Sequence, residues 1–412
     1  MNIFRSLKYR NFKLFFYGQS ISLMGTWMQK TAVAWLVYRL TGSAFLLGLV
    51  TFVSLIPSLI LPPYAGSFID RHDRFKTLVN TQIISMIQAF ALAAMIYFKF
   101  YSITGIIFLS LVQGVVNAFD VTCRQSLMID MVDDPADLPN AIALNSSMTN
   151  LARIVGPAIA GVVLSTLGED FCFVSNFLSY IPVLICLYLM RINTSVTERP
   201  EKKIWVELRE GFSYISSEKE LSSLIVLLAI SSMFVIPFNT LMPIFAKDLF
   251  HGTAKTFSLF ESAIGLGALI SAVYLANLKT SENLIKIAIV ACLLFGAGIL
   301  LLSLTRFLPA SLFFMVLSGV GMMAQTSAIN TYIQTHAAPN MRGRAISYYI
   351  MAYQGVIPVG SLLVGALAEV VGAKTTVAIE GIIGIVAAIG FVYYRVYVRG
   401  SGRLSLAGMR AK

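Results

Sequence analysis

The sequence predicts an all-α membrane protein with twelve transmembrane helices in two six-helix pseudo-repeats. Composition is the first reason: 57% of the 412 residues are hydrophobic and only 12% are charged, where a soluble domain carries about 25% charged residues. The mean hydropathy is +0.78. The second reason is a series of apolar stretches of membrane-spanning length, and the third is an internal repeat that relates the two halves of the chain.

Each expected span is an apolar stretch of about 20 residues, which as a helix crosses a bilayer core about 30 Å thick. Most connections between spans are only a few residues long, so neighbouring helices should run antiparallel. The twelve spans lie near residues 14–39, 44–69, 77–98, 103–125, 142–166, 171–191, 222–247, 255–278, 284–304, 308–333, 345–369 and 375–398.

The distribution of positive charge predicts the orientation, because cytoplasmic loops carry an excess of lysine and arginine. With the N-terminus inside, most of the 31 Lys and Arg residues fall in inner segments and few fall in outer loops. We therefore expect a multi-pass protein of the bacterial inner membrane with both termini in the cytoplasm. The net charge of +11 then reflects this topology and contact with anionic membrane lipid, and nucleic-acid binding is not expected.

The longest break between spans divides the chain into two halves. We expect an N-terminal six-helix bundle at residues 1–191, a cytoplasmic linker at 192–221 and a C-terminal six-helix bundle at 222–412. A single shift in numbering aligns the halves without a gap, pairing Pro135 with Pro339, Ala141 with Ala345, Gly156 with Gly360, Gly161 with Gly365 and Gly168 with Gly372. Such duplication in a polytopic protein is typical of transporters whose halves rock about a site between them.

The linker contains a short amphipathic pattern. Ile204, Leu208 and Phe212 recur one helical turn apart, and Trp205 lies beside the first of them. This spacing predicts a helix. Two interpretations stay open: an interfacial helix in the headgroup layer, or a solvated linker helix.

A charged turn, "GSFIDRHDRFKTL", separates the second and third spans. It resembles the signature loop of the major facilitator superfamily, whose pattern is G-x-x-x-D-R-x-G-R-R with variants. The matching residues are Gly66, Asp70, Arg71 and Arg74. Asp73 and Phe75 depart from the pattern. The absence of a side chain at Gly66 would let another helix approach closely.

This resemblance implies a latch that closes the two halves on the inner side. Asp70 would meet the start of the eleventh helix, near residues 342–346, where unpaired N–H groups and the helix dipole favour an anion. Arg74 would reach an acid at the inner end of the fourth helix, where Asp120 stands with Arg124 one turn further on. The alternative is a solvated positive loop whose ion pairs contribute little.

A second motif lies in the fifth span. The stretch "ARIVGPAIAG" resembles the superfamily's antiporter motif G-x-x-x-G-P-x-x-G-G, and its key residues are Ala152, Gly156, Pro157 and Gly161. Small residues four apart permit close helix packing, and proline can bend a helix. We expect the eighth span, with Gly265, Gly267 and Ser271, to face this helix. The motif favours export, although ordinary helix packing also explains its glycines.

A third superfamily pattern is incomplete, since Ser110 stands in the fourth span where the R-x-x-Q-G motif has arginine. Any proton-relay role of that arginine is therefore in doubt. The chain as a whole resembles the branch of enterobactin-exporter-like and drug efflux permeases, through "SLMGTWMQKTAVAWLVYRLTGSAFLLG" and "DLPNAIALNSSMTNLARIVGPAIAG".

Polar residues within the spans are the candidates for contact with substrate. Gln19, Ser22, Thr26 and Gln29 form one stripe on the first helix, with Lys30 on its flank. A charge inside the membrane should face a cavity or a partner, so Lys30 and Arg153 are expected near the substrate. Further candidates, each of which could instead bond another helix, are Gln325, Asn330 and Gln354.

Two interpretations of the buried cations stay open. Lys30 and Arg153 could bind an anionic or carbonyl-rich substrate such as a catecholate. Alternatively, Lys30 could pair with Glu261 of the eighth helix or Glu380 of the twelfth. Protonation of Glu261 would then loosen the pair and couple transport to the proton gradient.

The sequence therefore predicts a secondary active transporter that works by alternating access, most simply in proton-coupled export of a small amphiphile such as a siderophore or drug. It contains no P-loop, no catalytic motif and no metal-ligand spacing, so we expect no enzyme activity, no cofactor and no metal. Alternatives are an importer of a small organic anion or sugar, and a lipid flippase. We expect a monomer.

Overall fold

The computed structural model describes residues 4–192, 204–276, 283–339 and 341–398. Every regular element in these ranges is a helix. The contacts divide the chain into two compact units. Unit 1 consists of Met1–Glu201 and Met242–Ser262, and unit 2 consists of Lys202–Leu241 and Ala263–Lys412. The expected division into two bundles of six spans stays a prediction.

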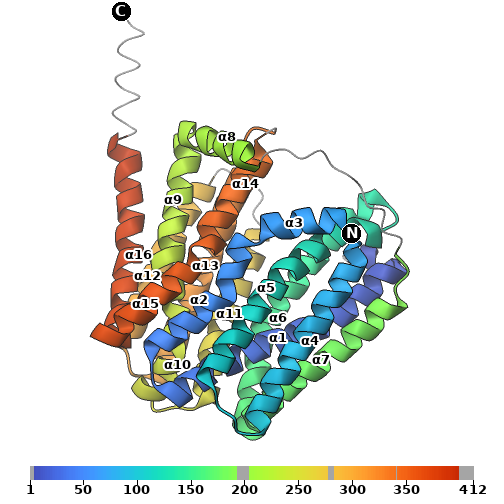
Figure 1. The fold of residues 1–412 in the computed structure, drawn as a ribbon. Coiled ribbons are helices and arrows are strands. Elements are labelled where there is room, and N and C mark those ends of the chain that lie inside the picture. Colours follow the sequence, from blue (N-terminus) through green and yellow to red (C-terminus); the bar gives the residue numbers. More distant parts are fainter. Residues whose placement is uncertain (1–3, 193–203, 277–282, 340, 399–412) are drawn as a thin grey trace, which may run out of the picture. The chain divides into compact units, whose positions relative to one another are not determined.

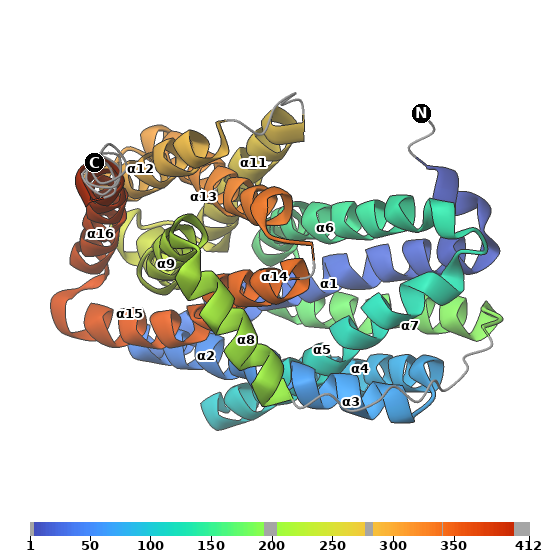
Figure 2. The same cartoon turned by 90° about the horizontal axis from the view of Figure 1, so that it is seen from above.

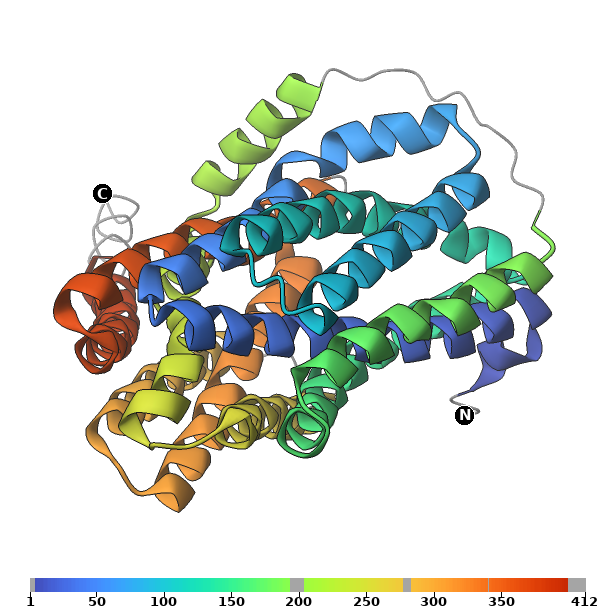
Figure 3. The same ribbon diagram turned by 60° about the horizontal axis from the view of Figure 1, so that its bottom comes forward.

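Unit 1 is built around α1, which packs against α6 and α7, and around α4, which packs against α5 and α7 (Figures 1 and 3). Its elements are η1 (Arg5–Lys8), α1 (Arg10–Thr41), α2 (Ala44–Ile60), α3 (Pro62–Arg71), α4 (Arg74–Tyr97), α5 (Ile103–Leu127), η2 (Met128–Met131), η3 (Pro135–Asp137), α6 (Leu138–Thr166), α7 (Glu169–Leu189), α10 (Met242–Ile244), η5 (Phe245–Leu249) and the first part of α11 (Ala254–Ala276). Fully buried Phe12, Phe15 and Leu78 belong to its core.

Local chemistry explains where these helices begin and end. The Ser43 hydroxyl accepts the Leu46 N–H at the start of α2, and the Asp73 carboxylate accepts the Phe75 and Lys76 N–H groups at the start of α4. Such N-caps satisfy amide groups that have no partner inside the helix. Gly42 ends α1 at φ 64°, a left-handed conformation that glycine adopts without strain.

The second expected span is divided in the structure. Residues 44–69 were predicted as one helix, but α2 ends at Ile60 and α3 begins at Pro62 and runs in a different direction (Figure 1). Proline favours the first turn of a helix, where its missing N–H is not needed, and it disfavours helical geometry in the residue before it. The pair Pro62 and Pro63 therefore starts a new helix.

Unit 2 is built on α12, which packs against α13 and α16. Its elements are α8 (Ile204–Ser217), α9 (Lys219–Phe234), η4 (Ile236–Leu241), the rest of α11, α12 (Leu284–Leu304), α13 (Leu308–His336), α14 (Arg342–Ile350), η6 (Met351–Gly355), α15 (Ile357–Val371), α16 (Ala373–Tyr393) and η7 (Tyr394–Val398). Viewed from above, α8 crosses the ends of α9 and α14 (Figure 2). The linker helix expected around residues 204–212 is thus present as α8, although the side chains of Ile204, Trp205 and Leu208 lie outside the described part.

Ten helices among the described residues are long and apolar enough to cross a membrane. They merge some short elements, so that Lys219–Leu249 and Arg342–Val371 each count as one. The two remaining expected spans are α1, which carries the polar stripe and Lys30, and α2, which is an apolar helix of 17 residues. A total of twelve spans therefore stays a prediction.

Candidate functional site

The candidate site lies in unit 1, around Lys30 of α1. The side chain of Lys30 is exposed, and its ammonium lies 4.8 Å from the centroid of the Trp27 ring. This is a cation–π distance. The charges of Glu261 on α11 and of Arg153 on α6 also act on Lys30. Two cations and one carboxylate thus share one neighbourhood within helices of membrane-spanning length.

The motif on α6 brings Arg153 to this neighbourhood. The motif residues Ala152, Gly156, Pro157 and Gly161 are all buried. A Cβ added at Gly156 would lie 2.5 Å from the Trp27 Cβ, and one added at Gly161 would overlap Ser258 of α11. The small residues therefore let α1 and α11 approach α6 closely, as small residues do in membrane helices.

A pair of stacked aromatic rings places Glu261 of α11 at the level of Lys30 of α1 along the helices. The rings of Trp35 on α1 and Phe257 on α11 stack with centroids 6.4 Å apart and an interplanar angle of 17°. A little more than one turn from Trp35 toward the start of α1 leads to Lys30, and one turn further along α11 leads from Phe257 to Glu261. Charge interaction between Lys30 and Glu261 agrees with this register.

One expectation about this interface was wrong. We predicted that Gly265, Gly267 and Ser271 of α11 would face the α6 motif; for Gly265 and Ser271 this stays a prediction, but Gly267 does not face it. Instead, a Cβ at Gly267 would collide with the backbone of Val316 and Gly319 on α13, within unit 2. The part of α11 that meets the motif lies about two and a half turns earlier, at Ser258, and this spacing puts Gly267 on the opposite face of the helix.

The polar stripe of α1 is occupied by hydrogen bonds between helices. The Asn176 amide of α7 donates to Gln29 Oε1 at 2.7 Å, and Gln29 Nε2 donates to Gln88 of α4 at 3.3 Å. The Thr26 hydroxyl lies 3.3 Å from the Tyr180 hydroxyl. The remaining stripe residues, Gln19 and Ser22, are buried. Contact of this stripe with substrate therefore stays a prediction, and Lys30 is the exposed member of the set.

The expected site residues of unit 2 occupy different environments. Gln325 is buried and donates to the Ser231 hydroxyl at 2.9 Å. Asn330 is partly buried and accepts a bond from Gln334 at 3.1 Å. Gln354 is exposed, and Glu380 is fully buried in α16. Among the described residues, Gln354 is thus the most accessible of these candidates.

The residues of the expected latch lie at the junction of α3, α4 and α5. Asp120 forms an ion pair of 2.8 Å with Arg124 and accepts a bond of 2.6 Å from Gln82. Arg74 begins α4 close enough to the end of α5 that its charge acts on Cys123.

The other residues of the expected latch are Arg71, Asp70 and Gly66, all on α3. Arg71 ends α3 with an exposed side chain, and the side chain of Asp70 lies outside the described part. The close approach expected at Gly66 is not found among the described residues, because an added Cβ would meet no atom within 4 Å. Gly66 lies on a short surface helix, and a latch between the two halves stays a prediction.

A charged cluster at the start of α6 was missed. Asp137 is 2% exposed, and its carboxylate binds Arg5, Lys8 at 2.8 Å and the Tyr9 hydroxyl at 2.8 Å. The bond to Asp137 raises the pKa of Lys8 above its usual value. The cluster ties the short helix η1 to α6. The sequence contains features that could have predicted this cluster: Asp137 is the single acid in "PADLPNAI", and basic residues precede the first span.

A second missed cluster lies at the far end of α1, which we predict to be the outer end. The Tyr38 hydroxyl donates to the Asp248 carboxylate of η5, and the Lys247 ammonium lies 5.2 Å from the Tyr38 ring centroid. Arg39 pairs with Glu169 of α7 at 2.8 Å. The Tyr38 contacts join η5 to α1 beyond the Trp35 stacking, the Arg39 ion pair joins α1 to α7, and all of them belong to unit 1.

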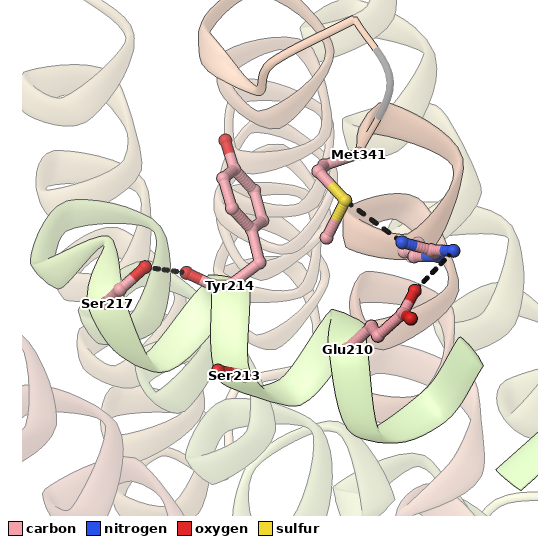
Figure 4. A pocket seen from close by; sticks show the side chains of 6 residues that line it. Glu210, Ser213, Tyr214, Ser217 and Met341 are labelled. Carbon is pink, nitrogen blue, oxygen red and sulfur yellow. Dashed lines mark hydrogen bonds and ion pairs between the residues drawn. The ribbon is translucent and has the colours of Figure 1, made fainter. Parts of the chain in front are cut away.

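Unit 2 carries a shallow pocket of about 390 Å³ between α8 and the start of α14 (Figure 4). Its lining residues are Glu210, Ser213, Tyr214, Ser217, Met341 and Arg344. Arg344 is paired with Glu210 at 2.7 Å, and the Tyr214 hydroxyl accepts the Ala338 N–H at 2.9 Å. The two charged groups of this pocket are therefore paired with each other across the contact between α8 and α14.

Helices of membrane-spanning length that carry a charged cluster are typical of a membrane transporter. A family model described as transmembrane secretion effector, within the major facilitator superfamily, matches residues 2–407, and the chain belongs to this family.

Relatives of known function are similar over most of their length. The staphyloferrin A transporter of Staphylococcus aureus is 26% identical over 90% of this chain and 92% of its own. Macrolide efflux protein A of Streptococcus pyogenes is 23% identical over 89% of this chain and 92% of its own.

A solved structure shows the same fold. It is a bacterial homologue of the human lysosomal transporter Spinster in an inward-facing, occupied conformation, with a TM-score of 0.73, 13% identity, and coverage of 95% of this chain and 98% of that one. The expected superfamily is confirmed.

Proposed function

We propose that this transporter exports a small amphiphile, a siderophore or a drug, across the bacterial inner membrane in exchange for protons and by alternating access. The observation that carries the proposal is the cluster of Lys30, Arg153 and Glu261 within unit 1. Export is supported by the relatives, one a siderophore transporter and one a macrolide efflux protein.

The cluster suggests how substrate and proton could compete. An exposed Lys30 beside an aromatic ring offers a cation and an apolar surface to an anionic, aromatic substrate. Glu261 interacts with Lys30 when it is ionised and not when it is protonated, so a proton on Glu261 would free Lys30 to bind substrate. One charge that moves across 100 mV supplies about 2.3 kcal/mol, which is enough to drive a useful concentration ratio.

The test is transport in inverted membrane vesicles with an imposed pH gradient and a panel of catecholates, macrolides and cationic dyes. We expect gradient-dependent accumulation of at least one compound by the wild type, and a loss of roughly tenfold in Lys30→Ala. Lys286→Ala removes the same charge from an exposed position on α12 and should transport normally. Glu261→Gln should still exchange substrate but should lose its dependence on the gradient.

Other outcomes would point elsewhere. Uptake only in right-side-out vesicles would indicate an importer, and movement of labelled lipid without transport of any test compound would indicate a flippase. Normal gradient-driven accumulation by both Lys30→Ala and Glu261→Gln would remove the cluster from the mechanism.

A further inference from the structure

Glu380 lies in the middle of α16, the helix that packs against α12 in unit 2. Its side chain is 2% exposed. Both carboxyl oxygens are buried, and among the described residues neither has a hydrogen-bond partner. A buried polar group without a partner is rare in a native structure and requires an explanation.

The helix of Glu380 packs closely against α12 next to this residue. A Cβ added at Gly381 would lie 2.7 Å from the Leu300 backbone nitrogen, and one added at Gly384 would lie 3.1 Å from the Gly296 Cα. Glycine on both helices therefore brings the backbones of α12 and α16 into close contact in the turn that follows Glu380.

Among the residues that the structure describes, no countercharge compensates the carboxyl group. The elements packed against α16 are α9, η4, α12, α15 and η7. Among the described residues, the ionisable side chains on these elements and on α16 itself are Lys219, Glu220, Lys286, Cys292, Glu369, Lys374, Tyr393, Tyr394 and Arg395. None of them acts on Glu380, whose environment is set by burial alone. A bare carboxylate in such surroundings is far less stable than a neutral carboxylic acid.

A chain of polar contacts starts one turn from Glu380. The Cys292 thiol lies 3.5 Å from the Gly384 carbonyl oxygen and 3.6 Å from the Ser231 hydroxyl. Ser231 in turn accepts the bond from Gln325 on α13. Buried polar atoms thus connect the helix of Glu380 with one of the residues expected to contact substrate.

We propose that Glu380 is a proton-binding site of unit 2. The carboxyl group carries a proton in the conformation described here. When the packing of α12 against α16 opens, its O–H bond breaks, the proton passes to a water molecule and a carboxylate remains. The role of this step in transport rests on the proposed proton coupling, but the presence of the proton on Glu380 does not.

The first test is infrared spectroscopy of the purified full-length protein in lipid nanodiscs at neutral pH. We expect a carbonyl stretch of a protonated carboxyl group in an apolar environment, lost in Glu380→Gln and shifted in Glu380→Asp. A wild-type spectrum in which no band depends on Glu380 would overturn the proposal. If Glu380→Gln fails to fold, the shift in Glu380→Asp still decides the assignment.

The second test is transport in proteoliposomes, with a compound accumulated by the wild type. A pH gradient of one unit supports about a tenfold concentration ratio per proton exchanged. Glu380→Gln should retain substrate exchange within twofold but lose the gradient-driven ratio, and Glu380→Asp should restore it. Glu369→Gln, at an exposed position on α15, is the matched control and should behave as the wild type.

The two proposals fail in different ways. Gradient-driven accumulation that survives in folded Glu380→Gln would overturn the role of Glu380 in coupling. If the wild type accumulates no compound under any gradient, the proposed export function fails, and the infrared test still decides whether Glu380 holds a proton.

Discussion

Replacing Gly156 by alanine tests whether α1 packs against α6 at this position as closely as the structure shows. The new Cβ would lie 2.5 Å from the Trp27 Cβ, whereas ordinary contacts are 3.4–4 Å, so the helices would have to separate by about 1 Å. Overpacking of this kind costs about 1–3 kcal/mol. Alanine also favours the helix over glycine by about 0.5–1 kcal/mol, which offsets part of the loss.

Gly66→Ala provides the control, because an added Cβ there meets no atom within 4 Å. It receives the same helix-propensity gain without the overpacking, so the two variants should differ in free energy of unfolding by about 1–3 kcal/mol. The assay is denaturation in mixed micelles followed by tryptophan fluorescence. Equal unfolding free energies for the two variants would show that α1 does not pack against Gly156 as described.

Two further predictions concern the ends of unit 1. Tyr38→Phe removes the hydroxyl that binds Asp248 and keeps the ring beside Lys247, so α1 and η5 should separate more often. A cysteine placed at Trp35 should then react severalfold faster with a water-soluble maleimide. An unchanged reaction rate would contradict this prediction. Asp137→Ala leaves the positive charges of η1 without their carboxylate, so η1 should detach from α6 more often. Proteolysis of the chain before α1 should therefore become faster in 0.15 M salt. Equal cleavage of variant and wild type would show that the cluster does not restrain η1.

The sequence predicted the helices well wherever local chemistry decides them. Apolar stretches are local features, and the span expected at residues 284–304 has the same bounds as α12. The caps at Ser43 and Asp73 and the turn at Gly42 also depend on neighbouring residues alone, although none of them was predicted. The break at Leu61 was also local, but the apolar pattern of residues 44–69 continues through it. One continuous helix was therefore predicted from the unbroken apolar stretch, and the helix start at Pro62 was overlooked.

The site was predicted less completely, because its contacts join residues far apart in the chain. Lys30 and Glu261 could be suspected as a pair, since a charge within a membrane helix requires a partner or a cavity. That Gln29 binds Asn176 could not be foreseen, because the hydrogen bond depends on how α7 is rotated about its axis. The anchor at Asp137 needed the fold as well, since six helical elements separate it from Arg5.

Helix α11 begins in unit 1 and continues into unit 2, with the boundary directly after Ser262. Glu261 is therefore the last ionisable residue before an uninterrupted rod of backbone hydrogen bonds passes from one unit to the other. If the units pivot as the proposed function requires, this continuous helix would have to bend or swing within one turn of Glu261. Under the same proposal, protonation of Glu261 would change the charge at the point where the backbone passes from unit 1 to unit 2.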